Sequence, residues 1–418
     1  MRLVIVSALY PPVAFGGYEV ECSAVVERLR ERHSVLVLTS DRHRERAVAE
    51  EPGLRRELAA LTGDWRGALR APAASVRAVA SARRVLAWEP DLIYVWNGSS
   101  IPQAAVRVLA DSGVPLAFRI CEHWFGGLFT IDQYMRELLP LQRSPARALW
   151  SAGCRGLNAR PSLRLRPTAP LRAAISWNSE ALRGMVATPD FVQPVLERVG
   201  HSVPRYGEVY EQVSREPAAE PEIAFIGRVT PYKGLAVAIE AMALLRSEHG
   251  IAARLVVIGH EDAEHGAELH RLAERLGVAE AVHWRGQCSP QEAAAVLARA
   301  HALIVPSIWQ EPFPLVTIEG AFARVPLVAS DIGGIGEGMH HEQHALLFAP
   351  GDADAAAAAL ARTLHEPAET AARVARAYER AQSFRLAPYL EDQERFLADA
   401  LAALAPRTVE AALASPEP

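Results

Sequence analysis

The sequence has few cysteines and no long apolar run. Its four cysteines, Cys22, Cys121, Cys154 and Cys288, lie far apart and form no Cys-x-x-Cys pair, which argues against a disulfide scaffold or a zinc ribbon. No apolar stretch approaches the ~20 residues of a membrane-spanning helix. The first residues are too short for a signal peptide and have no cleavage pattern. We therefore expect a cytoplasmic protein.

The sequence also has no large excess of charge of either sign. The 44 basic and 49 acidic residues leave a net charge of −5, which argues against a generally basic nucleic-acid binder. Half of the residues are hydrophobic and 22% are charged, so a large core can form and wholesale disorder is excluded. A length of 418 residues predicts two or three domains. Arginine is abundant and lysine is rare.

Short apolar runs alternate with longer amphipathic stretches, which predicts β-α-β units and parallel sheets. The expected strands are 3–7, 34–39, 92–96, 115–120 and 173–177, and then 222–226, 254–258, 281–285, 301–305, 325–329 and 345–348. The polar segment 214–222 contains two prolines and is interpreted as a linker. The fold class is therefore α/β, with two doubly wound, Rossmann-like domains facing across a cleft.

The domain limits follow from this pattern. We expect a first domain over 1–214, a second over 222–384, a last helix over 385–403 that crosses back to the first domain, and a frayed tail over 404–418. Ligands of open parallel sheets bind at the carboxyl ends of the strands, so we look for ligand-binding motifs just after the strands.

The segment from Glu311 to Glu319 reads EPFPLVTIE and follows an expected strand. Pro314 suits a first helical position, which would leave the amides of Leu315, Val316 and Thr317 free to bind phosphate. One of the two carboxylates could hold sugar hydroxyls and the other a ribose. The alternative is a helix start with ordinary acidic residues.

The segment GRVTPYKG follows the strand at 222–226 and contains Arg228 and Lys233. An arginine fork and a lysine point charge could together neutralise a diphosphate leaving group. The alternative is a surface loop with two solvated cations.

Two weaker signals lie in the first half. Gly16 and Gly17 follow the first strand and could let the backbone approach a phosphate or a sugar, although they form no G-x-G-x-x-G fingerprint. His123 follows the strand at 115–120 and could bind a sugar hydroxyl or carry a proton. Such glycines are common in turns, and a single histidine is as often structural.

Metal-like patterns have simpler explanations. Asp352 and Asp354 open an alanine-rich helix, so helix capping is the better account. The histidines 340, 341 and 344 lack the H-E-x-x-H spacing and suit a turn, and those at 260, 265 and 270 do not share one helical face. We expect no metal site.

The stretch 138–178 has no acidic residue and seven arginines, at 143, 147, 155, 160, 164, 166 and 172. It could be a basic lid that contacts an anionic acceptor or a membrane surface from Arg143 to Arg172. A solvated insertion is an equal alternative.

Together these residues resemble the family-4 retaining glycosyltransferases of the GT-B fold, which include many bacterial enzymes. The resemblance is strongest over 222–352, in GRVTPYKG, VVIG, the Glu311/Glu319 pair, VPLVASDIGG and LLFAPGD. It is weaker in the first half, where it rests on the glycine pair, His123 and the Asn178-Ser-Glu segment. Two departures are GHED at 259–262, in place of GDGP, and Pro-Phe-Pro after Glu311.

The resemblance implies a transfer from a nucleotide diphosphate sugar to a hydroxyl acceptor, without metal or other cofactor and with retention by a front-face mechanism. Arg228 and Lys233 would hold the diphosphate, Glu319 the ribose, and Glu311 with Phe313 and the amides at 315–317 the sugar. Gly16 and Gly17 would approach the phosphate, His123 the sugar, and Gly286 and Gln287 the base. Acceptors could be natural products, saccharides or lipid-linked sugars. A nucleotide-sugar epimerase and a non-catalytic binding protein are the alternatives.

Overall fold

The computed structural model describes residues 1–12, 17–41, 51–60, 65–99, 101–128 and 169–405, and they form two compact units. The first unit contains the described residues up to Asn178, Arg183–Gly200 and the chain from Leu390 onward. The second contains Ser179–Leu182 and His201–Tyr389. The arginine-rich stretch expected over 138–178 lies mainly outside the described residues, as do Gly16 and most of the tail.

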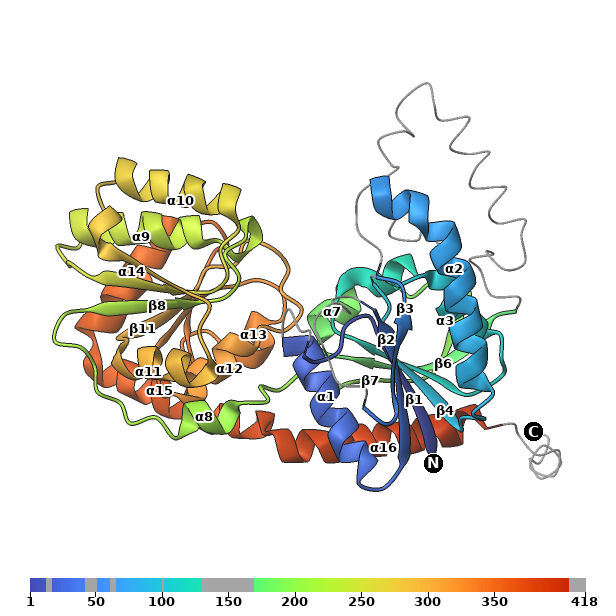
Figure 1. The fold of residues 1–418 in the computed structure, drawn as a ribbon. Helices are drawn as coiled ribbons and strands as arrows, with labels where there is room; N and C mark the ends of the chain where they lie inside the picture. The colour runs from blue at the N-terminus through green and yellow to red at the C-terminus, as the bar shows by residue number, and fades with distance from the viewer. Residues whose placement is uncertain (13–16, 42–50, 61–64, 100, 129–168, 406–418) are drawn as a thin grey trace. The chain divides into compact units, whose positions relative to one another are not determined.

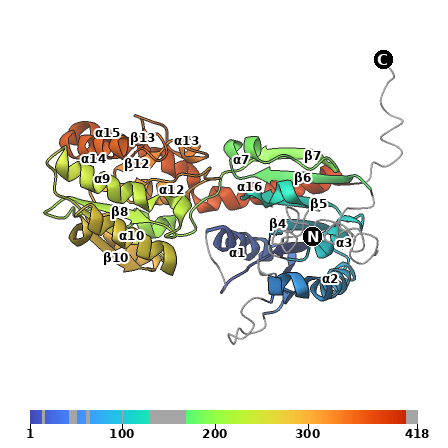
Figure 2. The same ribbon diagram turned by 90° about the horizontal axis from the view of Figure 1, so that it is seen from above.

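The first unit is built on a seven-stranded sheet in which every recorded pairing is parallel (Figure 1). In spatial order its strands are β3 (Leu54–Leu58), β2 (Ser34–Ser40), β1 (Arg2–Ser7), β4 (Leu92–Asn97), β5 (Leu116–Ile120), β6 (Leu171–Trp177) and β7 (Val192–Val199). Figure 2 shows β4 to β7 following one another across the sheet. The five strands expected from the sequence are confirmed to within two residues at each end.

The strands that the sequence did not predict, β3 and β7, are the two edges of this sheet. Strand β3 reads LRREL and β7 reads VQPVLERV. Edge strands are partly solvated and tolerate charges and proline, so they lack the continuous apolar run on which the prediction relied. Residue Pro194 lies beside a register shift between Ala173 and Ala174 of β6.

Helices cover both faces of the first sheet. Its helical segments are α1 (Gly17–Arg30), α2 (Trp65–Leu86), α3 (Gln103–Ala110), the 3-10 turn η1 (His123–Gly127), part of α7 (Glu180–Met185) and most of α16 (Leu386–Leu404). Helices α2 and α3 lie side by side in both views (Figures 1 and 2). Helix α1 contacts α16 through an ion pair between Arg28 and Glu394. No described helix is long and apolar enough to cross a membrane.

The second unit is built on a six-stranded sheet whose recorded pairings are also parallel. In spatial order its strands are β10 (Val282–Gly286), β9 (Arg254–Ile258), β8 (Glu222–Ile226), β11 (Ala302–Val305), β12 (Leu327–Ser330) and β13 (Leu346–Phe348). All six expected strands are confirmed to within two residues. Five of them are mostly buried apolar runs, whereas the edge strand β10 reads VHWRG and is mostly exposed.

The remaining helical segments surround this sheet. They are α8 (Gly207–Glu211), η2 (Pro231–Lys233), α9 (Leu235–Ser247), α10 (Ala263–Arg275), η3 (Ala279–Ala281), α11 (Pro290–Arg299), α12 (Leu315–Phe322), α13 (Ile335–Gly338), α14 (Ala353–His365), α15 (Pro367–Ala381) and η4 (Gln382–Phe384). In Figure 1, α9, α10 and α14 cover one face, and α11, α12 and α15 cover the other. The Asp352 side chain accepts from the Ala355 amide at 2.9 Å, so the predicted capping role is confirmed.

The chain enters the second unit earlier than the linker expected at 214–222. Residues from His201 onward already belong to this unit. Helix α8 explains the difference, because Tyr210 is buried and Gly207 lies against the Phe322 ring of α12. Proline content marks 214–222 as a non-regular segment, but it does not show where packing changes.

Strand order also locates a binding edge in each sheet. The direction in which successive strands are added across the sheet reverses between β1 and β4 in the first sheet and between β8 and β11 in the second. In doubly wound sheets, ligands bind beyond the carboxyl ends of the strands at this switch point. In the second unit, the loops at that position are 227–234 and 306–314, which contain the two strongest sequence motifs.

Candidate functional site

The loops after β8 and β11 pack directly against each other. Gly234 has φ +69°, and a Cβ there would lie 1.9 Å from the Pro306 carbonyl oxygen. The Ile308 amide donates to the Tyr232 carbonyl at 3.0 Å. Only glycine permits both this backbone conformation and this approach. The local sequence therefore fixes where Lys233, the residue before Gly234, can point.

Lys233 and Glu311 form an ion pair at the switch point. The Lys233 Nζ lies 2.6 Å from Glu311 Oε1, and the Ser307 hydroxyl donates to the same oxygen at 2.6 Å. The Glu311 side chain is 4% exposed and that of Lys233 is 22% exposed. An ammonium has three donors, so Lys233 can keep this bond and still donate to an anion. The structure thus brings together two predicted residues that the sequence motifs had assigned to separate tasks.

Lys233 is the only lysine among the 418 residues, although 44 residues are lysine or arginine. Every other basic position of that set is therefore arginine. A compact ammonium differs from a guanidinium in size and in the direction of its donors. Its single occurrence at the switch point marks this position as one with a distinct chemical requirement.

Arg228 lies on the outer side of the same loop and is exposed. Its guanidinium carbon is 5.9 Å from the centre of the Tyr232 ring, and that ring is 5.2 Å from the Trp309 ring. This arrangement leaves the Arg228 side chain accessible to a ligand. Sequence reasoning missed Tyr232 and Trp309; two aromatic residues beside the motif cations were the available signal.

The start of α12 corrects one expectation. Pro314 is the N-cap residue, with φ −80° and ψ 105°, and not the first helical residue. The Thr317 amide donates to the Pro314 carbonyl at 3.2 Å, and the Thr317 hydroxyl donates to the same oxygen at 2.8 Å. Thr317 is therefore already bonded. The amides of Leu315 and Val316 make no hydrogen bond to any residue in the described part of the chain.

Glu319 lies in the second turn of α12, partly exposed and beside Tyr210. Desolvation raises the pKa of its carboxyl to about 7. Desolvation, and secondarily the nearby Glu319 charge, also raises the pKa of Tyr210. A carboxyl with such a pKa changes its charge near neutral pH, and only its ionised form accepts hydrogen bonds with both oxygens.

Phe313 is buried between two further aromatic rings. The His201 ring lies 4.9 Å from it and the Phe384 ring 5.5 Å. His201 Nε2 is 3.1 Å from Glu337 Oε2. Because Phe313 is only 7% exposed, it shapes the loop from inside and offers little surface to a ligand. No sequence motif pointed to His201, which is 112 residues from Phe313.

Glu337 also holds the short segment of the second unit that comes from the first half of the chain. It accepts hydrogen bonds from the amides of Glu180 at 2.9 Å and Ala181 at 2.5 Å. Burial alone would raise the pKa of Glu337, but the bonds from His201 and the two amides outweigh it and keep that pKa below its usual value. The carboxylate is therefore held ionised at neutral pH.

A second close approach joins the loops after β11 and β12. Gly333 has φ +58°, and a Cβ there would lie 2.2 Å from the Glu311 carbonyl oxygen. The Gly334 amide donates to that oxygen at 2.7 Å. The glycines at the end of the VPLVASDIGG segment thereby fix the backbone of Glu311, which explains why glycines are needed in that motif.

The loops after β9 and β10 complete this edge of the second sheet. Gly259 has φ +151°, and a Cβ there would lie 1.8 Å from the Gly227 carbonyl oxygen. Gly286 ends β10 with φ +69°, and Gln287 after it is exposed. Gly259 therefore lies at the carboxyl end of β9, which neighbours β8, and Gly286 at the carboxyl end of β10, which neighbours β9, as the sequence led us to expect.

The first-unit candidates lie at the carboxyl ends of their own strands. Gly17 is exposed and is the first residue of α1, whereas Gly16 is outside the described residues. His123 is exposed and begins η1, directly after β5. These positions agree with the expected placement after strands, and the ligand contacts proposed for them stay predictions.

The histidine patterns are structural where they are described. The His344 Nδ1 accepts from the His340 amide at 3.0 Å, and the His341 Nδ1 accepts from the Leu347 amide at 2.9 Å, in the expected turn before β13. His270 contacts Glu261 at 3.2 Å and the Trp284 ring. Within the described ranges, no group of three or more His, Cys, Asp or Glu side chains could hold a metal ion.

Comparison with known proteins finds a family model that matches the residues of this site. The model of the glycosyl transferases group 1 family matches residues 208–381. A glycogen synthase of Mycobacterium tuberculosis is 35% identical over 171 residues, which are 41% of this chain and 40% of that protein. A D-inositol 3-phosphate glycosyltransferase of Nocardia farcinica is 36% identical over 123 residues, 28% of this chain and 26% of that protein. The matched segments span less than half the length of these relatives.

Solved structures match over nearly the whole chain. The sucrose-phosphate synthase of Thermosynechococcus elongatus has a TM-score of 0.70 at 19% identity, covering 96% of this chain and 99% of that one. Anabaena HepE, solved in complex with UDP, has a TM-score of 0.66 at 18% identity, covering 96% and 100%. At such identities the likeness concerns the fold. Residues 208–381 therefore match the model of the glycosyl transferases group 1 family, and the two parallel-sheet units have the GT-B fold.

Proposed function

We propose that this protein transfers a sugar from a nucleotide diphosphate sugar to a hydroxyl group of an acceptor, with retention at the anomeric carbon. The observation that supports this most directly is the pairing of the sole lysine with the buried Glu311 at the switch point of the second sheet. The family of residues 208–381 and the relatives named as glycosyltransferases agree with it.

The chemistry proposed for this edge is stabilisation of a leaving group. As the bond between sugar and diphosphate breaks, negative charge grows on the phosphate oxygens. Lys233 and Arg228 supply two cations of different shape from one loop, and the Leu315 and Val316 amides supply donors at the start of α12. In a front-face reaction, the departing diphosphate takes the proton of the acceptor hydroxyl, so no nucleophilic carboxylate is needed.

The remaining residues receive substrate-holding roles. Glu311 holds sugar hydroxyls, because both of its recorded bonds fall on Oε1 and its second oxygen makes none to the described residues. Glu319 holds the ribose, and Gly286 with Gln287 contacts the base. Phe313 and Thr317, first assigned to the ligand, are given the task of shaping the loop. From the first unit, Gly16, Gly17 and His123 contact the donor.

The proposal requires no metal ion or other cofactor. It is supported by the capping bond of Asp352, which accounts for the one D-x-D pattern without a ligand. The acceptor is a natural product, a saccharide or a lipid-linked sugar, and the arginine-rich stretch is the candidate contact for an anionic one.

The decisive experiment has two stages. In a thermal-shift panel of UDP, GDP, ADP and TDP sugars, the sugar nucleotide with one of these bases should stabilise the protein. At a ligand concentration of a hundred times Kd, binding raises the free energy of unfolding by about 2.7 kcal/mol. That donor is then incubated with and without an acceptor library, and nucleoside diphosphate is measured. Release that requires an acceptor, with an α-linked product from an α-linked donor, supports the proposal. An epimer formed without acceptor, or binding without any release, contradicts it.

A further inference from the structure

Three side-chain hydrogen bonds hold the start of α1 within the first unit. The Trp96 indole nitrogen donates to the Tyr18 carbonyl at 3.2 Å. The Tyr18 hydroxyl donates to the Arg119 carbonyl at 2.8 Å. The Arg119 guanidinium donates to Glu21 Oε1 at 3.0 Å. Tyr18, directly after Gly17, and Glu21, four residues after it, thus tie the helix start to strands β4 and β5.

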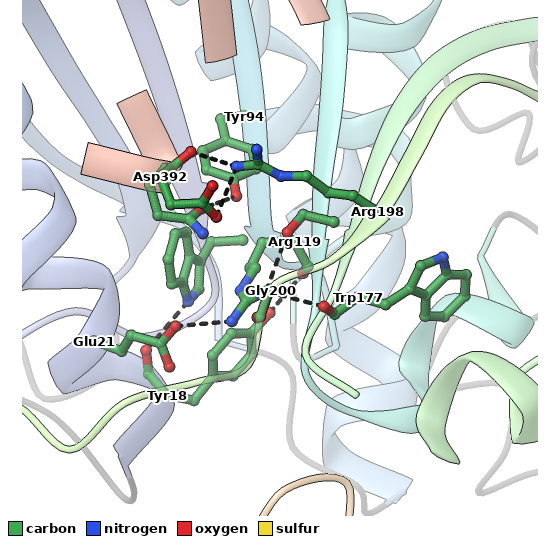
Figure 3. Close-up of polar contacts among 11 residues, drawn as sticks. Tyr18, Glu21, Tyr94, Arg119, Trp177, Arg198, Gly200 and Asp392 are labelled. Atoms are coloured by element: carbon green, nitrogen blue, oxygen red, sulfur yellow. Dashed lines mark hydrogen bonds and ion pairs between the residues drawn. The ribbon is translucent and has the colours of Figure 1, made fainter. Parts of the chain in front are cut away.

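The other terminal nitrogen of Arg119 binds a different part of the chain, as Figure 3 shows. It donates to the carbonyls of Gly200 at 2.7 Å and Trp177 at 3.3 Å. It also donates to the Ser176 hydroxyl at 3.1 Å. The chain leaves the first unit directly after Asn178 and again after Gly200. One guanidinium therefore links the start of α1 to both of these exits.

Stability alone is a poor explanation for this arrangement. The side chains of Arg119 and Glu21 are 0% and 2% exposed. The free energy needed to remove both charges from water cancels most of the free energy of their attraction. Apolar residues of similar volume often stabilise a fold equally well. A buried fork does fix several partners in one plane, which a lysine ammonium cannot do. The network is better explained by a need for exact geometry.

We propose that Arg119 is a positioning residue that sets the first turn of α1, and through it Gly17, for sugar transfer. The inference rests on the proposed function, because Gly17 matters only if the glycine turn contacts the donor. Arg119 itself is fully buried and touches no substrate. It acts through Glu21 and the Gly200 carbonyl.

The test compares Arg119→Lys with the matched control Arg198→Lys. Arg198 is a neighbouring, partly buried arginine whose recorded partners are Asp392 and the Phe396 ring of α16, with no recorded bond to α1. We expect Arg119→Lys to lower kcat at least tenfold while the Kd for the nucleoside diphosphate, most of whose proposed contacts lie in the second unit, rises by a smaller factor. Arg198→Lys should keep kcat within twofold. Equal kcat losses in both variants, or an unchanged kcat in Arg119→Lys, would overturn the proposal.

A measurement that does not depend on enzyme activity distinguishes a failure of this inference from a failure of the proposed function. Amide hydrogen exchange over residues 17–25 should be at least tenfold faster in Arg119→Lys than in Arg198→Lys. Should Arg119→Lys fail to fold, Tyr18→Phe removes a single bond of the same turn and should act in the same direction, with a smaller kcat loss. If exchange is faster in Arg119→Lys but the wild type transfers no sugar, the proposed function is contradicted and the anchoring role of Arg119 is kept. Unchanged exchange in both Arg119→Lys and Tyr18→Phe would defeat the anchor.

Discussion

Lys233 carries the most direct prediction at the scale of single residues. Removing it takes one charged hydrogen bond from the leaving diphosphate, worth about 1.5–3 kcal/mol. Lys233→Ala should therefore lower kcat/KM by about 10–150-fold, measured as nucleoside diphosphate release, and Lys233→Arg should recover only part of the loss. The exposed Arg271→Ala on α10 is the control and should keep wild-type turnover. Wild-type turnover in Lys233→Ala would remove this residue from the mechanism.

Glu319 predicts a pH dependence for nucleotide binding. With a pKa of about 7, the ionised fraction of its carboxyl rises about tenfold between pH 6 and pH 8. The wild type should bind the nucleoside diphosphate more tightly at pH 8, beyond any change that Glu319→Gln also shows through ionisation of the phosphate. Isothermal titration of both proteins at the two pH values measures this. Parallel pH profiles for the two proteins would contradict the ribose role.

The raised pKa of Glu319 also predicts that the folded protein becomes less stable as the pH rises, although nucleotide binding becomes tighter. The folded protein binds the Glu319 proton more tightly than the unfolded chain does, so this group lowers stability as the pH rises from about 4.5 to about 7. Glu319→Gln should therefore raise the melting temperature more at pH 8 than at pH 5. A larger gain at pH 5 would mean that burial does not raise this pKa.

At the scale of elements, the close approach of the loops after β8 and β11 can be tested with two glycines. Gly234 has φ +69° and lies against Pro306, whereas Gly250 has φ +67° and no atom within 4 Å of an added Cβ. Both Gly→Ala variants carry the backbone cost of about 1–2 kcal/mol, but only Gly234→Ala must also separate the loops. We expect its melting temperature to fall further and its Kd for nucleotide to rise at least tenfold. Equal effects at the two sites would show that the loops do not need this contact.

The elements show why sequence prediction succeeded in one sheet and was incomplete in the other. Five strands of the second sheet are mostly buried apolar runs that their apolar pattern identified, and the mostly exposed edge strand β10 was also predicted. Strands β3 and β7 are edges with charged or proline residues, and only their pairing with β2 and β6 makes them strands. The error at Pro314 has a similar origin. Proline is favoured at the first helical position, but here its carbonyl receives both the amide and the hydroxyl of Thr317, which places it at the cap.

At the scale of the whole molecule, the motifs after β8 and β11 lie at the carboxyl ends of these strands, where strand order places the switch point of the second sheet. The partners within that edge could not be predicted. The bond between Lys233 and Glu311 joins residues 78 apart, and Glu337 reaches amides 157 and 156 residues away. Such pairs depend on which loops pack together. The same limit applies to the unit boundary at His201, which is set by the packing of α8 on α12.

The central claim is that Lys233 meets the diphosphate of the donor. Since it is the only lysine present, reductive methylation with carbon-13 formaldehyde gives a single lysine signal, and methylation keeps its charge. Titration with the nucleoside diphosphate that stabilises the protein should shift this signal and saturate at the calorimetric Kd. A signal that stays unmoved while the nucleotide binds would contradict the account.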